Sequence, residues 1–175
     1  MCYVTETPDV LDSDAYLAAL NRPTPWTLEA LTRFRNPART LYRRIASAGS
    51  APVHRPYLAL LRFDDDRPAP ELAPVLNAAV SGSHALAASL FEINATASGI
   101  MTAERKIYSG GPAKQQFLVA VEGHYRARVV ECIQSVQLLL GPRIRDPESW
   151  VYWQEARVRA IDVRSDALGI EERVA

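Results

Sequence analysis

The short segment from Glu122 to Arg128 combines residue types that can move protons with residue types that hold anions. A histidine titrates at about pH 6.5, so His124 could act as a general base or a general acid. Glu122 lies two residues away, on the same side of an extended strand, and could orient the imidazole. Arg126 and Arg128 could hold a carboxylate or enolate oxygen. The segment therefore predicts cofactor-independent proton transfer, with His124 and Glu122 as catalytic residues. A histidine that caps a helix or lies in an interface is the alternative.

Aromatic side chains elsewhere in the chain could form the walls of the same site. They are Tyr108, Trp150, Tyr152 and Trp153. Together with Arg126 and Arg128 they predict a binding site for a small anionic or aromatic organic molecule. A lyase, isomerase or cyclase that needs no metal and no cofactor is the kind of enzyme that these residues permit.

Arginine is concentrated in one part of the chain. Residues 1–29 carry five acidic residues and one arginine, whereas residues 30–63 carry seven arginines and no acidic residue. Arg39 and Arg43 are four residues apart and would share one face of a helix over 37–48. Three uses remain open: a nucleic-acid or protein surface along 33–44, a clamp for an anionic small molecule, or pairing with the acidic arm and the Asp64–Asp66 turn. The zero net charge and the two lysines disfavour nucleic acid.

The sequence lacks several motifs that would indicate a particular chemistry. It contains no glycine-rich phosphate loop, no GxSxG, no HExxH and no CxxC. Three consecutive aspartates, Asp64–Asp66, indicate either a solvated turn or a metal site. His54, His84 and His124 are too widely spaced to predict a metal site, and the triplet Glu104-x-Lys106 is too common to indicate a metal nuclease. We therefore expect no metal.

Length and composition are typical of one ordinary globular domain. The chain has 175 residues, of which 48% are hydrophobic. No run of 18 apolar residues and no secretory signal is visible, which predicts a cytoplasmic protein without a membrane span. Cys2 and Cys132 predict no structural disulfide, and Cys132 is expected to be an inert core residue. Eighteen arginines against two lysines indicate a GC-rich bacterial genome.

The strongest structural signal is the segment from Gln116 to Gly141. Its residues 117–121 are all apolar, as in a strand covered on both faces, and the apolar spacing that follows is that of a helix ended by Gly141-Pro142. A second apolar strand is predicted over 57–63. The other expected elements are a helix over 72–80, a strand over 86–95, a β extension over 101–108 and a long edge strand over 150–163.

We expect these elements to divide the chain into four parts. Residues 1–13 form a flexible arm. Residues 14–50 form a helical extension packed on the main domain, with helices over 14–21, 25–35 and 37–48. Residues 51–165 form the α+β domain, and residues 166–175 form a tail.

The order of elements from residue 57 is β-α-β-β-α-β, which predicts a ferredoxin-like (split β-α-β) sheet. In that arrangement the first and third strands are central, and these are the two apolar ones. The order resembles that of the dimeric α+β-barrel class at the level of fold, which implies a homodimer whose sheets meet. A structural subunit that uses its last strand to pair with another chain is the alternative.

Overall fold

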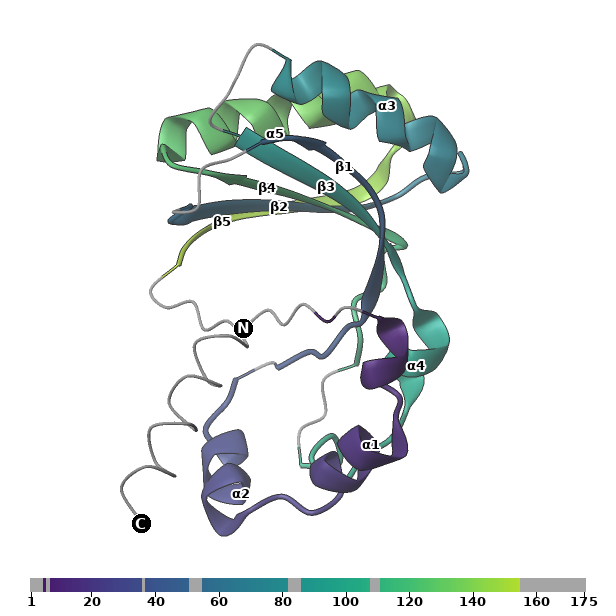
Figure 1. Cartoon of the computed structure of the whole chain (residues 1–175), viewed down its shortest axis with the longest axis vertical. Coiled ribbons are helices and arrows are strands. Elements are labelled where there is room, and N and C mark those ends of the chain that lie inside the picture. The colour runs from purple at the N-terminus through teal and green to yellow at the C-terminus, as the bar shows by residue number, and fades with distance from the viewer. Residues whose placement is uncertain are drawn as a thin grey trace, which may run out of the picture.

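The computed structural model describes residues 5, 7–35, 37–50, 55–81, 86–107 and 111–154. These residues form an α+β structure whose main body is a five-stranded antiparallel sheet with two helices on one face (Figure 1). A group of short helices lies apart from this body, in the lower half of Figure 1. In the described part of the chain, no helix has the length and the apolar composition needed to cross a bilayer.

The two apolar strands predicted from the sequence lie side by side in the middle of the sheet. They are β2 (Tyr57–Asp64) and β4 (Phe117–Gly123), paired antiparallel with Leu60 opposite Ala120. The full order is β1-β3-β4-β2-β5. The remaining strands are β1 (Tyr42–Gly49), β3 (Leu86–Ile93) and β5 (Arg145–Trp153). The prediction of a central apolar pair is confirmed.

The core lies between the sheet and the helices α3 (Ala69–Val80) and α5 (Arg126–Leu140), both predicted from their apolar spacing. Successive residues of β2 and β4 point to opposite faces, and alternate residues of both strands are buried. Among the buried residues, Phe63 and Phe117 lie with ring centroids 5.6 Å apart. The helices contribute Leu72, Leu76, Val129 and Val136.

The predicted helix over 37–48 is wrong, because this segment forms β1 along the outer side of β3. A bulge between Arg44 and Ala46 interrupts the two-residue alternation, which made the apolar spacing of this strand resemble that of a helix. Gly49 ends the strand with φ +76, and a Cβ there would lie 2.4 Å from the Leu86 carbonyl oxygen. This position therefore requires glycine as the end of a strand and not as the cap of a helix. Because β1 covers β3, β3 is not the edge strand that the sequence predicted.

The two helices predicted at the start of the extension are confirmed. They are α1 (Asp14–Leu20) and α2 (Pro25–Thr32), capped by the hydroxyls of Ser13 and Thr24. Neither contains a buried residue, so apolar packing contributes little to holding them. A short 3-10 helix, Pro8–Val10, precedes them.

The short helix α4 (Ala95–Gly99) is hydrogen-bonded to the residue that precedes β1. The hydroxyl of Ser98, in this helix, is fully buried and bonds to both the N–H and the carbonyl of Leu41, just before β1. The following residues to 107 form turns, so the β extension predicted over 101–108 is wrong for its described part.

The last described strand begins earlier than predicted. After the 3-10 helix Gly141–Arg143, β5 runs over 145–153. Among the described strands it pairs with β2 alone, which agrees with its predicted position at the edge of the sheet. The part of the predicted strand from 155 to 163 lies outside the described residues.

Candidate functional site

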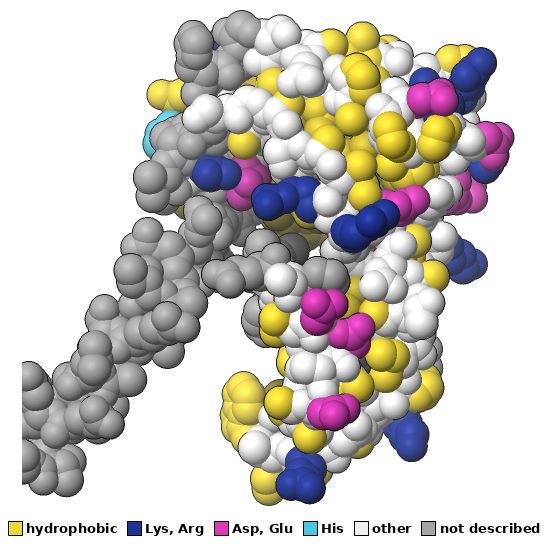
Figure 2. All heavy atoms as spheres, turned by 45° about the vertical axis from the view of Figure 1, so that its right-hand side comes forward, with side chains coloured by type: hydrophobic (Ala, Val, Ile, Leu, Met, Phe, Trp, Pro, Cys, Tyr) yellow, Lys and Arg dark blue, Asp and Glu magenta, His cyan; other side chains and the backbone are white. Residues whose placement is uncertain are grey.

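The face of the sheet opposite α3 and α5 carries half-buried apolar side chains from the central strands, and we refer to it as the open face. Strand pairing places the following residues on it: Leu58, Leu60 and Arg62 of β2; Leu118, Ala120 and Glu122 of β4; Ser89 and Phe91 of β3; Glu148, Trp150 and Tyr152 of β5; Tyr42 and Arg44 of β1. In Figure 2 basic and acidic side chains alternate along the lower border of the upper layer. The open face is thus an apolar floor with charged groups around it.

Arg62 is the charged residue nearest the middle of this floor. Its guanidinium carbon lies 4.3 Å from the centroid of the Trp150 ring, which is a cation–π contact. One of its nitrogens lies 3.4 Å from a carboxylate oxygen of Glu148, on the opposing position of β5. The Arg62 side chain is 26% exposed. Trp150 therefore holds the guanidinium in place, while Glu148 occupies only part of its hydrogen-bonding capacity.

Tyr42 brings a second donor to the open face from β1. Its hydroxyl is buried and, among the described residues, makes no hydrogen bond of ordinary geometry. The Arg62 guanidinium nevertheless lies close enough to act as a donor toward the Tyr42 oxygen, so the unsatisfied part of the hydroxyl is its O–H. Burial raises the pKa of Tyr42, and the nearby Arg62 guanidinium opposes this effect without cancelling it. The hydroxyl is therefore protonated at neutral pH. A buried polar group without a partner costs about 1–3 kcal/mol, so a ligand oxygen at this point would be favourable.

The predicted pair of catalytic residues lies at the end of β4. Glu122 is on the open face, and its carboxylate accepts a hydrogen bond of 2.8 Å from Arg55. His124 follows the strand and is exposed, with its ring edge-to-face with Tyr125 at a centroid distance of 4.8 Å. The carboxylate of Glu122 is thus oriented by an arginine that the sequence analysis did not place in the site.

The other predicted site residues are only partly brought together. Trp150 and Tyr152 share the open face with Glu122, whereas Trp153 points to the helix side and contacts Tyr57 edge-to-face at 5.0 Å. Arg126 and Arg128 are exposed at the start of α5, where Arg128 pairs with Glu131 at 3.0 Å. Tyr108 lies outside the described residues.

The arginines of the basic segment have mostly local partners. Arg33 pairs with Glu29, one helical turn earlier. Arg39 lies 5.7 Å from the Tyr16 ring, and Arg43 pairs with Glu92 at 3.2 Å across the β1–β3 ladder. Because 42–49 is a strand, Arg39 and Arg43 do not share the helical face that was predicted for them.

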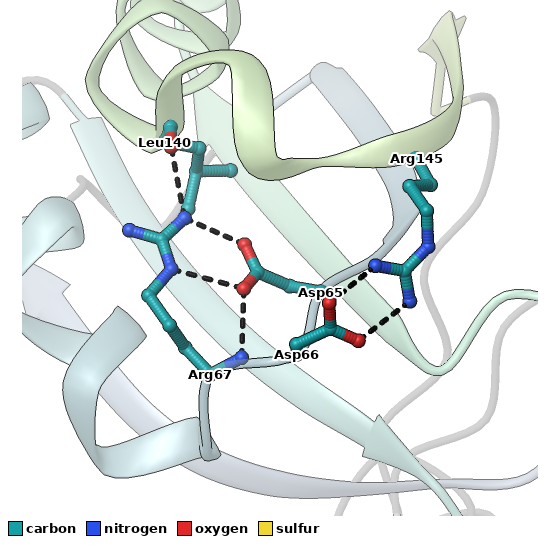
Figure 3. Close-up of polar contacts among 5 residues, drawn as sticks. All are labelled: Asp65, Asp66, Arg67, Leu140 and Arg145. Carbon is teal, nitrogen blue, oxygen red and sulfur yellow. Dashed lines mark hydrogen bonds and ion pairs between the residues drawn. The ribbon is translucent and has the colours of Figure 1, made fainter.

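The aspartates at 64–66 support the structure of the turn after β2, and Figure 3 shows two of them, Asp65 and Asp66. Asp64 accepts a bond of 2.7 Å from the backbone N–H of Gln116. Asp65 is buried and accepts from the backbone and the side chain of Arg67, which also donates to the carbonyl of Leu140 at 2.8 Å. Asp66 receives two bonds, of 2.8 and 2.9 Å, from Arg145. Within the described ranges, no three His, Cys, Asp or Glu residues are placed to hold a metal ion.

Cys132 is an inert thiol in the core. It lies on the buried side of α5, and its sulfur is 3.6 Å from the carbonyl oxygen of Ala79. Burial raises its pKa to about 11. The thiol therefore stays protonated at neutral pH, which agrees with its predicted role as a small hydrophobic residue.

Arg62 and Tyr42 are the functional candidates that the sequence analysis missed. Arg62 could have been found, because it is the one charged residue within the otherwise apolar stretch 57–63. Tyr42 could not have been found, because its segment was predicted to be a helix. Its approach to Arg62 depends on β1 lying next to β3 in the sheet.

Comparisons of the chain with models of known protein families, with curated proteins and with solved structures give no match. The function therefore has to be argued from the site itself.

Proposed function

We propose that this protein binds a small organic molecule, anionic or aromatic, on the open face of its sheet. The observation that carries the proposal is a cluster on that face: the Arg62 guanidinium stacked on Trp150, near a buried Tyr42 hydroxyl whose O–H has no acceptor among the described residues. Ligand sites are typically lined by apolar and aromatic side chains with a few fixed polar groups, which is the composition of this floor. Glu122 and Tyr152 lie on the same face and belong to the proposed site.

The alternative, a nucleic-acid or protein surface along 33–44, has less support. Arg33 and Arg43 are engaged with Glu29 and Glu92, and Arg39 contacts Tyr16. Phosphate recognition needs several arginines directed to one side. The contacts of these three favour local pairing, with partners other than the acidic arm and the Asp64–Asp66 turn that the sequence suggested.

We also propose that β2 to β5, with α3 and α5, form a ferredoxin-like unit to which β1 adds a strand, and that two cytoplasmic copies associate as in the dimeric α+β-barrel class. The order β3-β4-β2-β5, with the first and third strands of the unit in the middle, supports the first part. The apolar open face supports the second, because in such a dimer it would be covered by the partner's sheet. The small-molecule site would then be enclosed between the two sheets.

A ligand-detected NMR screen of anionic, aromatic and neutral aliphatic compounds tests the binding proposal. We expect hits among the anionic and aromatic compounds, and we expect Arg62→Met to weaken them by about tenfold or more, because the fork of donors is lost while the apolar stem is kept. Arg22→Met is the matched control at an exposed position outside the open face, and it should change nothing. Equal binding by both variants would place the site elsewhere and contradict the proposal.

We also propose proton transfer by His124, which follows the end of β4 away from Arg62, for a bound compound that extends along the open face to that end and can lose or gain a proton. His124→Ala should then abolish turnover of compounds found in the screen, since loss of a general acid or base typically reduces rates by about 10²–10⁴-fold. Because the side chain is exposed, circular dichroism and the melting temperature should not change. Unchanged turnover in this variant would exclude the reaction while leaving the binding proposal intact.

A further inference from the structure

The polar groups at the middle of the open face are hydrogen-bond donors. Tyr42 presents a buried O–H that has no acceptor among the described residues, and Arg62, close to the Tyr42 oxygen, presents a planar fork of five N–H groups. Among the described residues, Glu148 is the ion-pair partner of Arg62, through one nitrogen at 3.4 Å. Arg62 comes from β2 and Tyr42 from β1, on opposite sides of the β3–β4 pair, and one acceptor group between them would bond to both. A carboxylate has the two oxygens and the planar shape that such a pair can satisfy.

The surroundings of these donors favour a flat ring as the rest of the ligand. The row of residues through Arg62 contains Leu118 and Phe91, and the neighbouring row contains Leu60 and Ala120. All four are half-buried and belong to the pleated sheet, which gives a broad and shallow floor. A planar aromatic group buries more area on such a floor than a puckered or branched one.

Glu148 limits the charge that the site accepts. Its carboxylate stays beside the Arg62 guanidinium, so a ligand with two negative charges would meet repulsion that a monoanion avoids. Arg44, the other arginine of this face, is exposed at the far end of the row through Arg62, so the cluster itself offers one arginine and one hydroxyl, which are fewer donors than phosphate sites normally provide. The charge around the site therefore selects a single carboxylate over a phosphate or a dicarboxylate.

We infer that the ligand class of the open face is a planar aromatic monocarboxylate, whose carboxylate is held by Arg62 and Tyr42 and whose ring lies on the apolar floor. This inference rests on the proposed binding function and specifies the chemistry of that site.

Isothermal titration calorimetry of the full chain with four probes tests the inference. Benzoate is the model ligand. Benzamide lacks the charge, cyclohexanecarboxylate lacks the flat ring, and phthalate adds a second carboxylate. We expect benzoate to bind at least about tenfold more tightly than benzamide or phthalate, since one charge-assisted bond or one repulsive contact is worth about that much. We also expect it to bind more tightly than cyclohexanecarboxylate, because the flat ring makes the closer contact with the floor.

Tyr42→Phe separates a ligand-binding role from a structural one. The substitution should weaken benzoate binding by about tenfold, because a hydrogen bond to a carboxylate is lost. It should leave the melting temperature equal or higher, because a buried O–H without an acceptor among the described residues is removed. Tyr125→Phe is the control, since it removes an exposed hydroxyl at the start of α5.

The outcomes distinguish failure of this inference from failure of the proposed binding function on which it rests. If benzamide binds as well as benzoate, and Arg62→Met weakens both, the carboxylate assignment is overturned while binding on the open face stands. If benzoate binds but Tyr42→Phe has no effect on it, the role of Tyr42 is overturned. If no probe binds at millimolar concentration, the inference fails, and failure of the whole screen as well would remove the binding function.

Discussion

Phe63→Ala should lower the free energy of unfolding by about 4 kcal/mol, because truncation of a buried phenylalanine loses its transfer free energy and leaves a cavity. Phe63 is completely buried between the sheet and the helices, and its ring lies 5.6 Å from that of Phe117. Both residues come from the two central strands, which leaves little freedom for the backbone to close the cavity. Urea denaturation followed by circular dichroism measures the change.

Phe34→Ala is the matched control for this prediction. It makes the same chemical change at a residue just after α2 that is 57% exposed. Such a substitution should change the free energy of unfolding by no more than about 0.5 kcal/mol. Similar effects at Phe34 and Phe63 would contradict the location of the core between β2, β4 and the two helices.

The sequence predicted those elements in which burial alone determines where the apolar residues fall. Strands β2 and β4 were found because core packing on one face and a half-buried apolar floor on the other make nearly every residue apolar. Helices α3 and α5 were found because one side of each packs on the sheet. By contrast, β1 was assigned to a helix, because its bulge removes the alternation and because its pairing partner β3 lies more than forty residues later in the chain.

The candidate site was harder to predict than the fold, because it depends on contacts between strands that are distant in sequence. Aromatic residues Trp150 and Tyr152 were identified as walls of a site, and they do share a face with Glu122. The arginine that Trp150 contacts was not identified, because nothing local to residue 62 indicates which strand lies next to it. Arg39 and Arg43 were singled out for a helical spacing that the strand conformation of 42–49 removes.

Asp65→Asn is the second substitution for which we expect a large effect, a loss of about 3 kcal/mol. The Asp65 side chain is completely buried and accepts hydrogen bonds from the backbone N–H, Nε and Nη2 of Arg67, which in turn donates to the last carbonyl of α5 (Figure 3). Removal of one partner from a buried pair typically costs about 3–5 kcal/mol. We expect the lower end because the Arg67 side chain is 19% exposed and keeps some contact with water.

The neighbouring residue provides a control with almost the same chemistry. Asp66 also pairs with an arginine through two bonds, but its side chain is 87% exposed and so is half of Arg145. Exposed ion pairs of this kind contribute little to stability because water screens them. Asp66→Asn should therefore leave the denaturation midpoint nearly unchanged, and equal effects at the two positions would show that burial of Asp65 is not the cause.

The effect of Asp65→Asn should also depend on pH in one direction. Hydrogen bonds from the Arg67 side chain are the main cause that holds the pKa of Asp65 below its usual value, which is near 4. A carboxylate with a lowered pKa in the folded state contributes stability that is fully present above about pH 4 and is lost as the pH falls through the lowered value. The difference between the native chain and Asp65→Asn should therefore be constant from neutral pH down to about pH 5 and should shrink in more acidic solution. A difference that stays the same down to strongly acidic pH would mean that the shape of the turn, and not the charge of Asp65, ties β2 to the end of α5.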